Sequence, residues 1–414
     1  MSDAGAPHPA ARCEADRLAQ PGTAPARTLP PLALYAHFPW CVRKCPYCDF
    51  NSHALKQPID EARYVTALLQ DLQVQAESAD GRPIESIFFG GGTPSLFSPD
   101  ALQRLLAGIR ACLRIADDAE VTLEANPGTV ERGRFRDYRG AGITRVSLGA
   151  QSFSAEALKA LGRIHGPEDT VRAVEELHVA GLGNFNLDLM YGLPGQDLEG
   201  GIRDLERAIA LAPAHLSHYQ LTLEPGTPFA AAPPALPDED LLATLFSECA
   251  MRLAAAGFAR YEVSAYAQPG RRCRHNLNYW RFGDYLGVGA GAHGKITARD
   301  GTIVRSTRWR DPRRYVAGVG SAPEMRTLRQ AELPFEFMLN ALRLTDGFEL
   351  ELYAARTGEA PAALLPVLRK LEARGLVELA PEASWVRPTV RGMDFVNTML
   401  LEFLPEGAGI RRPA

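Results

Sequence analysis

Six short apolar runs alternate with longer helical patterns in the first part of the chain, and this alternation constrains the fold most strongly. The runs are predicted strands, and they cover residues 32–38, 86–89, 120–125, 145–150, 185–190 and 216–223. Short strands separated by helices form parallel sheets through right-handed crossover connections. The sequence therefore predicts an α/β fold, a partial (β/α)6 barrel, and not two packed β-sheets.

The segment after the second predicted strand shows the helical part of this alternation. Its apolar residues recur at i, i+3, i+4 and i+7, which places them on one face of a helix: Leu102, Leu105, Leu106 and Ile109. Asp100 precedes this stripe, and we expect it to cap the helix. Cys112 falls in the same helix, where we expect it to pack against neighbours and not to bind a ligand.

Polar and glycine residues cluster where each predicted strand ends, as in the run at residues 90–94. In α/β barrels the C-terminal ends of the strands build the active site. Turn chemistry accounts for the glycines and prolines. It does not account for Glu124, Gln151 and Asp188, which recur at equivalent places. The sequence therefore predicts a ligand site at this end of the barrel.

Three cysteines, Cys41, Cys45 and Cys48, follow the first predicted strand with three and then two residues between them. Thiolates at such a spacing can bind one iron–sulfur cluster, which normally takes four ligands. Three protein ligands leave one iron open to a small molecule. A zinc site completed by His37 or His53 and simple buried cysteines are the alternatives, although zinc sites usually hold four N or S ligands.

Composition argues against three classes of protein: disulfide-rich, broadly nucleic-acid-binding and membrane-spanning. Seven cysteines in 414 residues are too sparse for a disulfide framework, and no signal peptide precedes them, so we expect a cytoplasmic protein with reduced thiols. A net charge of −4 gives no reason to expect a broad nucleic-acid surface. No apolar run reaches the roughly 18 residues of a membrane span. Nothing in the sequence chooses between free cytosol and loose association with a membrane.

Four segments are expected along the chain. Residues 1–30 are rich in Ala and Pro and are predicted to be a disordered leader, residues 31–325 the barrel with an extension, and residues 406–414 a tail. Residues 326–405 predict a C-terminal module with helices at 333–342, 349–357, 361–374 and 392–403 and strands at 376–379 and 385–388. This order resembles a winged helix. Because its third helix mixes basic and acidic residues, we expect a cover for the barrel mouth rather than a nucleic-acid-binding module.

A second polar motif lies at residues 271–280, where His275 stands in a basic patch and is followed by Tyr279 and Trp280. Haem binding needs an axial nitrogen, cations for the propionates and flat apolar surface for the ring face. All three occur within this segment. A packed, hydrogen-bonded histidine is the alternative interpretation.

The three motifs CxxxCxxC, GGGTP and HNxxYW, taken together, resemble the coproporphyrinogen dehydrogenase branch of the radical S-adenosylmethionine (SAM) superfamily, and within it the HemW family of haem chaperones. The resemblance covers about residues 32–403. It implies a [4Fe–4S] cluster on Cys41, Cys45 and Cys48, with SAM on the open iron. It also implies haem contacts at His275, Tyr279 and Trp280. The further residues expected to line the cofactor site are Tyr35, Phe50, Gly91, Gly92, Thr93, Glu124, Gln151, Arg163, Asp188 and Gln220.

One departure from the dehydrogenase pattern bears on function. That pattern continues as CxxxCxxCxC, and this chain has Phe50 at the position of the last cysteine. The resemblance therefore implies a haem chaperone, which binds haem and passes it to acceptor proteins, with no catalytic residues expected. An oxygen-independent coproporphyrinogen III dehydrogenase, which performs an oxidative decarboxylation, is the alternative. The sequence leaves open whether SAM is cleaved, which protein accepts the haem, and the oligomeric state.

Overall fold

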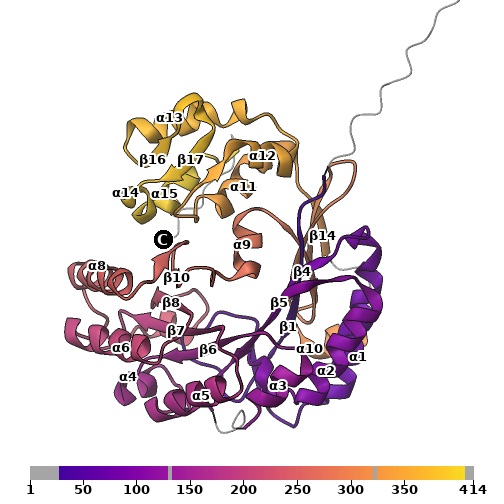
Figure 1. The fold of residues 1–414 in the computed structure, drawn as a ribbon, viewed down its shortest axis with the longest axis vertical. Helices are drawn as coiled ribbons and strands as arrows, with labels where there is room; N and C mark the ends of the chain where they lie inside the picture. The colour runs from indigo at the N-terminus through magenta and orange to yellow at the C-terminus, as the bar shows by residue number, and fades with distance from the viewer. Residues whose placement is uncertain (1–27, 129–132, 320–323, 406–414) are drawn as a thin grey trace, which may run out of the picture.

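A curved sheet of parallel strands forms the centre of the molecule (Figure 1). The structure is a computed structural model that describes residues 28–128, 133–319 and 324–405. Six strands follow the predicted runs: β1 (Leu32–Phe38), β4 (Ile84–Gly91), β5 (Ile115–Ala125), β6 (Arg145–Gln151), β7 (Phe185–Tyr191) and β8 (His215–Gln220). Each is parallel to its neighbour in the order β1-β4-β5-β6-β7-β8. The predicted leader lies outside the described residues except for residues 28–30, and the tail at 406–414 lies outside them entirely.

The sheet is an open, partial barrel. A seventh parallel strand, β11 (Asp284–Val288), pairs with β1 and was not predicted. Antiparallel strands extend both edges, so that the full order is β14-β13-β12-β11-β1-β4-β5-β6-β7-β8-β10-β9. Within the described residues the two outer strands do not pair with each other. The added strands are β9 (Ala259–Arg260), β10 (Ala265–Ala267), β12 (His293–Thr297), β13 (Ile303–Thr307) and β14 (Glu324–Thr327).

Helices cover the outer face of the parallel strands, as the alternating pattern predicts (Figure 1). Strand β1 is almost continuously apolar because parallel strands in such folds are buried on both faces. The apolar stripe of α2 lies in the same core cluster as β1 and β4. The covering helices are α1 (Glu61–Gln75), α2 (Pro99–Cys112), α3 (Phe135–Ala141), α4 (Ala155–Ala160), α5 (Pro167–Val179), α6 (Leu198–Ala210) and α8 (Glu239–Ala255).

The predicted cap of α2 was wrong by two residues. The N-cap is Ser98, whose side-chain oxygen accepts a hydrogen bond from the backbone N–H of Ala101 at 3.2 Å. Pro99 then takes the first helical position, where its missing N–H has no cost. Asp100 lies in the first turn, where its charge still favours the helix dipole. Cys112 is the last residue of this helix.

A second hydrophobic core lies mainly in the C-terminal module, around Phe337, Tyr353 and Leu368, and also includes Phe282 and Ile303 from the preceding segment. Its third helix is shorter than predicted, because residues 361–363 form a 3-10 turn before α13. The final predicted helix is divided at Phe395 into α14 and α15. The elements are α11 (Leu333–Ala341), β15 (Phe348–Glu349), α12 (Leu350–Thr357), α13 (Leu365–Ala373), β16 (Val377–Leu379), β17 (Trp385–Pro388), α14 (Val390–Asp394) and α15 (Val396–Leu401).

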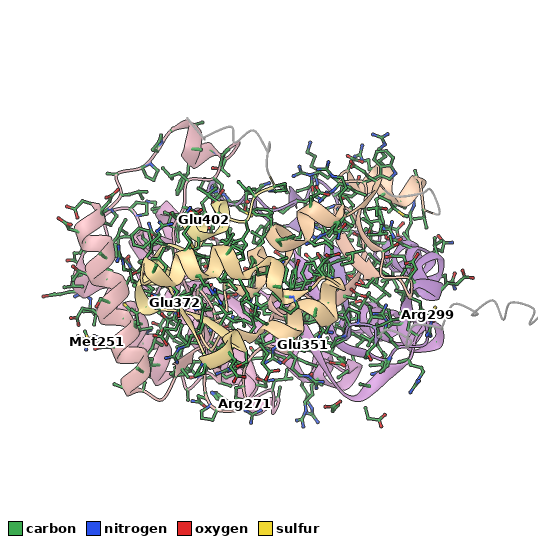
Figure 2. All side chains as sticks on the ribbon, turned by 90° about the horizontal axis from the view of Figure 1, so that it is seen from above. Met251, Arg271, Arg299, Glu351, Glu372 and Glu402 are labelled. Atoms are coloured by element: carbon green, nitrogen blue, oxygen red, sulfur yellow. The ribbon has the colours of Figure 1, made fainter. Side chains whose placement is uncertain are left out.

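The module does not cover the barrel mouth as expected. It packs beside α9 (Arg274–Trp280), at the end of the barrel where the parallel strands begin (Figure 1). An ion pair of 2.6 Å between Arg305 on β13 and Glu336 on α11 joins the two parts. Seen from above in Figure 2, the module lies between helix α8, marked by Met251, and the turn that carries Arg299. In the part of the chain that the structure describes, no helix is both long and apolar enough to span a bilayer.

Candidate functional site

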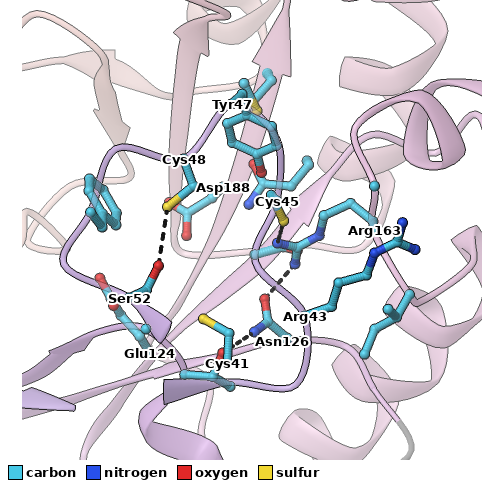
Figure 3. A pocket seen from close by; sticks show the side chains of 18 of the residues that line it. Cys41, Arg43, Cys45, Tyr47, Cys48, Ser52, Glu124, Asn126, Arg163 and Asp188 are labelled. Carbon is cyan, nitrogen blue, oxygen red and sulfur yellow. Dashed lines mark hydrogen bonds between the residues drawn. The ribbon is translucent and has the colours of Figure 1, made fainter. Parts of the chain in front are cut away.

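The three cysteines lie in a loop at the C-terminal end of β1. Two short strands, β2 (Trp40–Cys41) and β3 (His53–Ala54), pair in parallel and close this loop at its base. Cys41, Cys45 and Cys48 all line one cavity of about 470 Å3 (Figure 3). Within the loop the N–H of Cys48 donates to the carbonyl of Cys45 at 3.2 Å. The strand end therefore presents three thiols to one space.

The glycine run forms the neighbouring wall of this cavity, and it needs glycine for steric reasons. A Cβ on Gly92 would lie 2.6 Å from the carbonyl oxygen of Trp40, and one on Gly91 would lie 2.5 Å from the His37 ring. Gly91 also has a φ of +115°, which other residues rarely adopt. The N–H groups of Gly92 and Thr93 donate to Phe38 and Trp40 at 2.7 Å each. The close backbone packing fixes this wall against the cysteine loop.

Two carboxylates face the cavity from β5 and β7, the strands on either side of β6. Glu124 at the end of β5 accepts a hydrogen bond from the N–H of Gly91 at 2.9 Å. Burial, and then the nearby Asp188, raise the pKa of Glu124 to about 8. Burial also raises the pKa of Asp188, although its carboxylate accepts hydrogen bonds from Asn186 at 2.7 Å and Ser147 at 3.2 Å. Arg145 offsets part of the rise in both pKa values, and two carboxyl groups whose pKa values stay raised favour a positively charged ligand.

A guanidinium lies across the cavity from these carboxylates (Figure 3). Arg163 donates to the carbonyl of Gly149 at 2.8 Å and to the side-chain oxygen of Asn126. Its other terminal nitrogen lies 3.8 Å from the sulfur of Cys45. Its Nε is buried without a protein partner. A carboxylate-bearing ligand could therefore complete the hydrogen bonding of this side chain.

Gln151 ends β6 in an unusual backbone conformation, with φ at +67°. Non-glycine residues held in this region cost free energy and persist where the surrounding structure fixes them. The side-chain oxygen of Gln151 accepts a hydrogen bond from the hydroxyl of Tyr219 at 2.7 Å. Both side chains line the cavity, as does Gln220. The strain turns the amide of Gln151 towards the ligand space.

Most of the predicted cofactor residues line the cavity, but Tyr35 does not. The hydroxyl of Tyr35 shares a hydrogen bond with Nδ1 of His37 at 2.9 Å, directly behind Gly91. Phe50 stands at the rim with 58% of its surface exposed. The predicted residues that the structure brings together are Cys41, Cys45, Cys48, Phe50, Gly91, Gly92, Thr93, Glu124, Gln151, Arg163, Asp188 and Gln220.

The second motif lies in α9, at the opposite end of the barrel, where the parallel strands begin. The ring of His275 is 1% exposed, and both of its nitrogens have partners: the Ser86 hydroxyl at 3.1 Å and the Tyr279 hydroxyl at 2.9 Å. Burial, and then Arg145, lower the pKa of His275 to about 3. The ring stacks on Phe88 with centroids 5.0 Å apart. The structure therefore holds His275 as a packed, hydrogen-bonded residue.

A buried carboxylate holds the start of this helix. Glu120 accepts hydrogen bonds from the backbone N–H groups of Arg274 at 3.0 Å and His275 at 3.4 Å. The thiol of Cys273 also points at this carboxylate, at 3.5 Å. Trp280, at the other end of the helix, leaves its ring N–H without a partner among the described residues. Among the polar side-chain atoms of His275, Tyr279 and Trp280, this ring nitrogen alone has no partner in the described part of the chain.

Several cavity residues were missed in the sequence. Asn126 joins two walls, because its amide donates to the hydroxyl of Thr93 at 2.9 Å and accepts from Arg163. Ser147 and Tyr219 also line the cavity. Asn126 follows Glu124 in the polar segment at the end of a strand, so its position was a usable signal. Ser147 and Tyr219 lie within strands, where nothing in the sequence separates them from core residues.

The residues present fit an iron–sulfur cluster and SAM. Among the described residues, no three His, Cys, Asp or Glu side chains are gathered closely enough to hold a single metal ion. A [4Fe–4S] cluster has a different requirement, since each cysteine binds a different iron. The three thiols on one cavity meet that requirement, and the cavity extends beyond them to other polar side chains. The Nε of Arg163, which has no protein partner, is a group that a second ligand could satisfy.

Comparisons with protein families match the same two parts of the chain. The family model described as "Radical SAM superfamily" matches residues 35–224, and the one described as "HemN C-terminal domain" matches residues 328–395. Among solved structures, coproporphyrinogen III oxidase (HemN) from Escherichia coli superposes with a TM-score of 0.77. That match covers 91% of each chain at 23% identity, so it shows the fold.

Curated relatives are closer in sequence. A protein named "Heme chaperone HemW" from Escherichia coli is 51% identical over 378 residues, which is 91% of this chain and 99% of the relative. The protein of the same name from Mycobacterium tuberculosis is 37% identical, over 83% of this chain and 90% of the relative. A mouse protein, "Radical S-adenosyl methionine domain-containing protein 1, mitochondrial", is 38% identical over 69% of this chain and 65% of its own.

Proposed function

The chain belongs to the HemW family of the radical SAM superfamily, and from this premise we propose that it is a haem chaperone. It binds haem and transfers it to acceptor proteins. The observation that carries the proposal is the cavity in which three cysteines meet two buried carboxylates, in a chain whose relatives are named haem chaperones. Phe50, at the position of the dehydrogenase's additional cysteine, supports a chaperone over an oxidase.

Cys41, Cys45 and Cys48 would hold a [4Fe–4S] cluster in this cavity. When bound there with SAM, the cluster supplies one-electron chemistry. The remaining volume suits SAM, which carries an ammonium, a sulfonium and a carboxylate. Glu124 and Asp188 offer negative charge to the cationic groups, and a bound cation would lower the raised pKa of Glu124.

The other cavity residues orient this ligand. Arg163 would pair with the ligand carboxylate through the nitrogen that has no protein partner. The amide of Gln151, fixed by Tyr219, can accept or donate a hydrogen bond at a ribose hydroxyl. Gly91, Gly92 and Thr93 form one wall of the ligand space, and the two glycines let this wall pack closely against His37 and Trp40.

Haem contacts at His275, Tyr279 and Trp280 stay a prediction. In the conformation described here, binding of iron by His275 would require its hydrogen bonds to Ser86 and Tyr279 to break. A displacement of α9 from the barrel would be needed for this. The division into residues 31–325 and 326–405 also stays a prediction, because the second hydrophobic core includes Phe282 and Ile303 as well as residues of the module.

A paired assay tests the proposed function. Protein with a reconstituted cluster is titrated with haem and then mixed with a haem-free acceptor, and transfer is followed by absorbance. In parallel, the same protein receives SAM, a reductant and coproporphyrinogen III without oxygen. We expect haem binding and transfer with no protoporphyrinogen formed. Product that depends on Cys45 would instead establish the dehydrogenase alternative.

A further inference from the structure

A second cavity shares the base of the cysteine loop, and we infer that it is a docking site for haem. It is a groove of about 640 Å3, within the roughly 300–1,000 Å3 of small-molecule sites. Its walls come from Trp40, from residues 53–64 and from residues 311–317 at helix α10 (Pro312–Ala317). None of its lining residues also lines the cysteine cavity. The inference rests on the proposed haem function and names a binding place for it.

One wall of the groove is apolar and rigid. Trp40, Ile59 and Val316 are partly buried and packed against the main core, so that each leaves a face in the groove. Trp40 is fixed edge-on against Tyr64, with ring centroids 4.6 Å apart and planes at 73°. A fixed surface of aromatic and branched side chains suits the flat face of a porphyrin.

The rim of the groove is weakly basic. Lys56, Arg63 and Arg313 are exposed, and none of the three forms an ion pair among the described residues. The two acidic residues of the groove are held as helix caps. Asp60 accepts from the N–H of Arg63 at 3.0 Å, and Asp311 accepts from the N–H of Arg314 at 2.8 Å. Both carboxylates keep their charge, so the three cations exceed them by one, and no carboxylate of the described residues pairs with these cations in place of the haem propionates.

His53 supplies a nitrogen for the iron. It is exposed in β3, and its ring forms no hydrogen bond within the described part of the chain. Its backbone is fixed, because its N–H donates to the carbonyl of Pro39 at 2.7 Å. Histidine is the commonest metal ligand among side chains, and it is an axial ligand of haem iron. His53 can bind iron as the fold stands, whereas His275 must first lose two hydrogen bonds.

The groove is joined to the cysteine loop through the backbone. The N–H of Leu55 donates to the carbonyl of Cys41 at 2.9 Å, and the N–H of Thr93 donates to the carbonyl of Trp40 at 2.7 Å. Haem docked against Trp40 and His53 would therefore touch the strand pair that positions Cys41. This places the proposed cargo beside the cofactor cavity without occupying it.

Haem titration of the full-length protein tests the site, with haem itself as the probe. For His53→Ala we expect an affinity about tenfold weaker, together with loss of the absorbance signature of histidine-bound iron. Lys56→Gln combined with Arg313→Gln should weaken binding about threefold through the lost propionate contacts. His178→Ala is the matched control, because His178 is an exposed histidine on α5, far from the groove in sequence and element.

The outcomes distinguish failure of the proposed groove from failure of the proposed haem function. Unchanged haem affinity in His53→Ala, with binding lost in His275→Ala, overturns the groove and leaves the haem function standing. Absence of haem binding by the unmutated protein overturns both. A second measurement uses no variant: carbethoxylation of His53, followed by mass spectrometry with and without haem. Protection of His53 by haem supports the groove, and equal modification in both samples contradicts it.

Discussion

The cysteine cavity and helix α9 carry the two polar motifs of this chain, and they differ in whether their polar groups still lack partners. In the cavity, Glu124 and Asp188 face open space, and burial raises the pKa of both. In α9, both ring nitrogens of His275 are bonded to protein. A sequence motif shows which groups are present. Only the structure shows which of them are still available to a ligand.

The largest expected effect lies in the cavity, where Cys45→Ala removes one of three cluster ligands. After anaerobic reconstitution we expect no stable cluster, because two thiolates cannot hold it. The visible absorbance of the cluster and the iron content check this. Cys112→Ala is the control, since Cys112 ends α2 and lines no part of the cavity. A full cluster in the Cys45 variant would place the site elsewhere.

Gly92→Ala tests the glycine wall. Its new Cβ would meet the backbone oxygen of Trp40 at 2.6 Å, so the wall must move away from the cysteine loop. We expect SAM affinity to fall by about tenfold to a hundredfold, which corresponds to a shift of roughly 1.4–2.8 kcal/mol. Calorimetric titration of the reconstituted protein measures it. Gly140→Ala in α3 should bind SAM normally, because its Cβ meets nothing within 4 Å.

Glu124→Gln tests the cavity through the pH dependence of the protein's stability. A carboxyl whose pKa is raised in the folded state stabilises the protein below the unfolded pKa of about 4.3, and this stability is lost as pH rises towards about 8. The free energy of unfolding of the ligand-free variant should therefore exceed that of the parent by up to about a few kcal/mol at pH 8 and not at pH 4. Melting temperatures at the two pH values measure this difference. It should also bind SAM more weakly. An equal effect at both pH values would contradict the raised pKa of Glu124.

Glu120→Ala tests helix α9, the region whose polar groups are already bonded to protein. It removes the carboxylate that accepts from the N–H groups of Arg274 and His275, and leaves both without this partner. We expect a loss of about 1–3 kcal/mol in the free energy of unfolding, measured by denaturant titration. Asp117→Asn, at an exposed position of the same strand, should change little. A stability equal to the parent would mean that α9 is held by other contacts.

The sequence predicted the elements that depend on local pattern. All six predicted strands are present, and Glu124, Gln151 and Asp188 face one cavity, because parallel strands end at the same edge of a sheet. Ser98 was missed as the cap of α2, although Ser, Asp and Asn all serve at that position. The choice among neighbouring capping residues depends on geometry that the sequence pattern does not contain.

What could not be predicted depends on contacts between distant segments. Strand β11 pairs with β1 across about 250 residues of chain, and no local pattern reports that register. The partners of His275 have the same origin, since Ser86 lies 189 residues away. The groove also joins residues 53–64 to residues 311–317. Whether a polar side chain is free or bonded is decided by these long-range pairings.

Hydrogen–deuterium exchange on the reconstituted protein, with and without SAM, tests the contrast between the two regions most directly. We predict that SAM slows exchange in peptides covering residues 90–93 and 41–48. Peptides covering residues 273–280 should exchange slowly in both samples and should not change. Protection by SAM at residues 273–280, or none at residues 90–93, would contradict the assignment of the cavity as the open ligand site and α9 as the closed one.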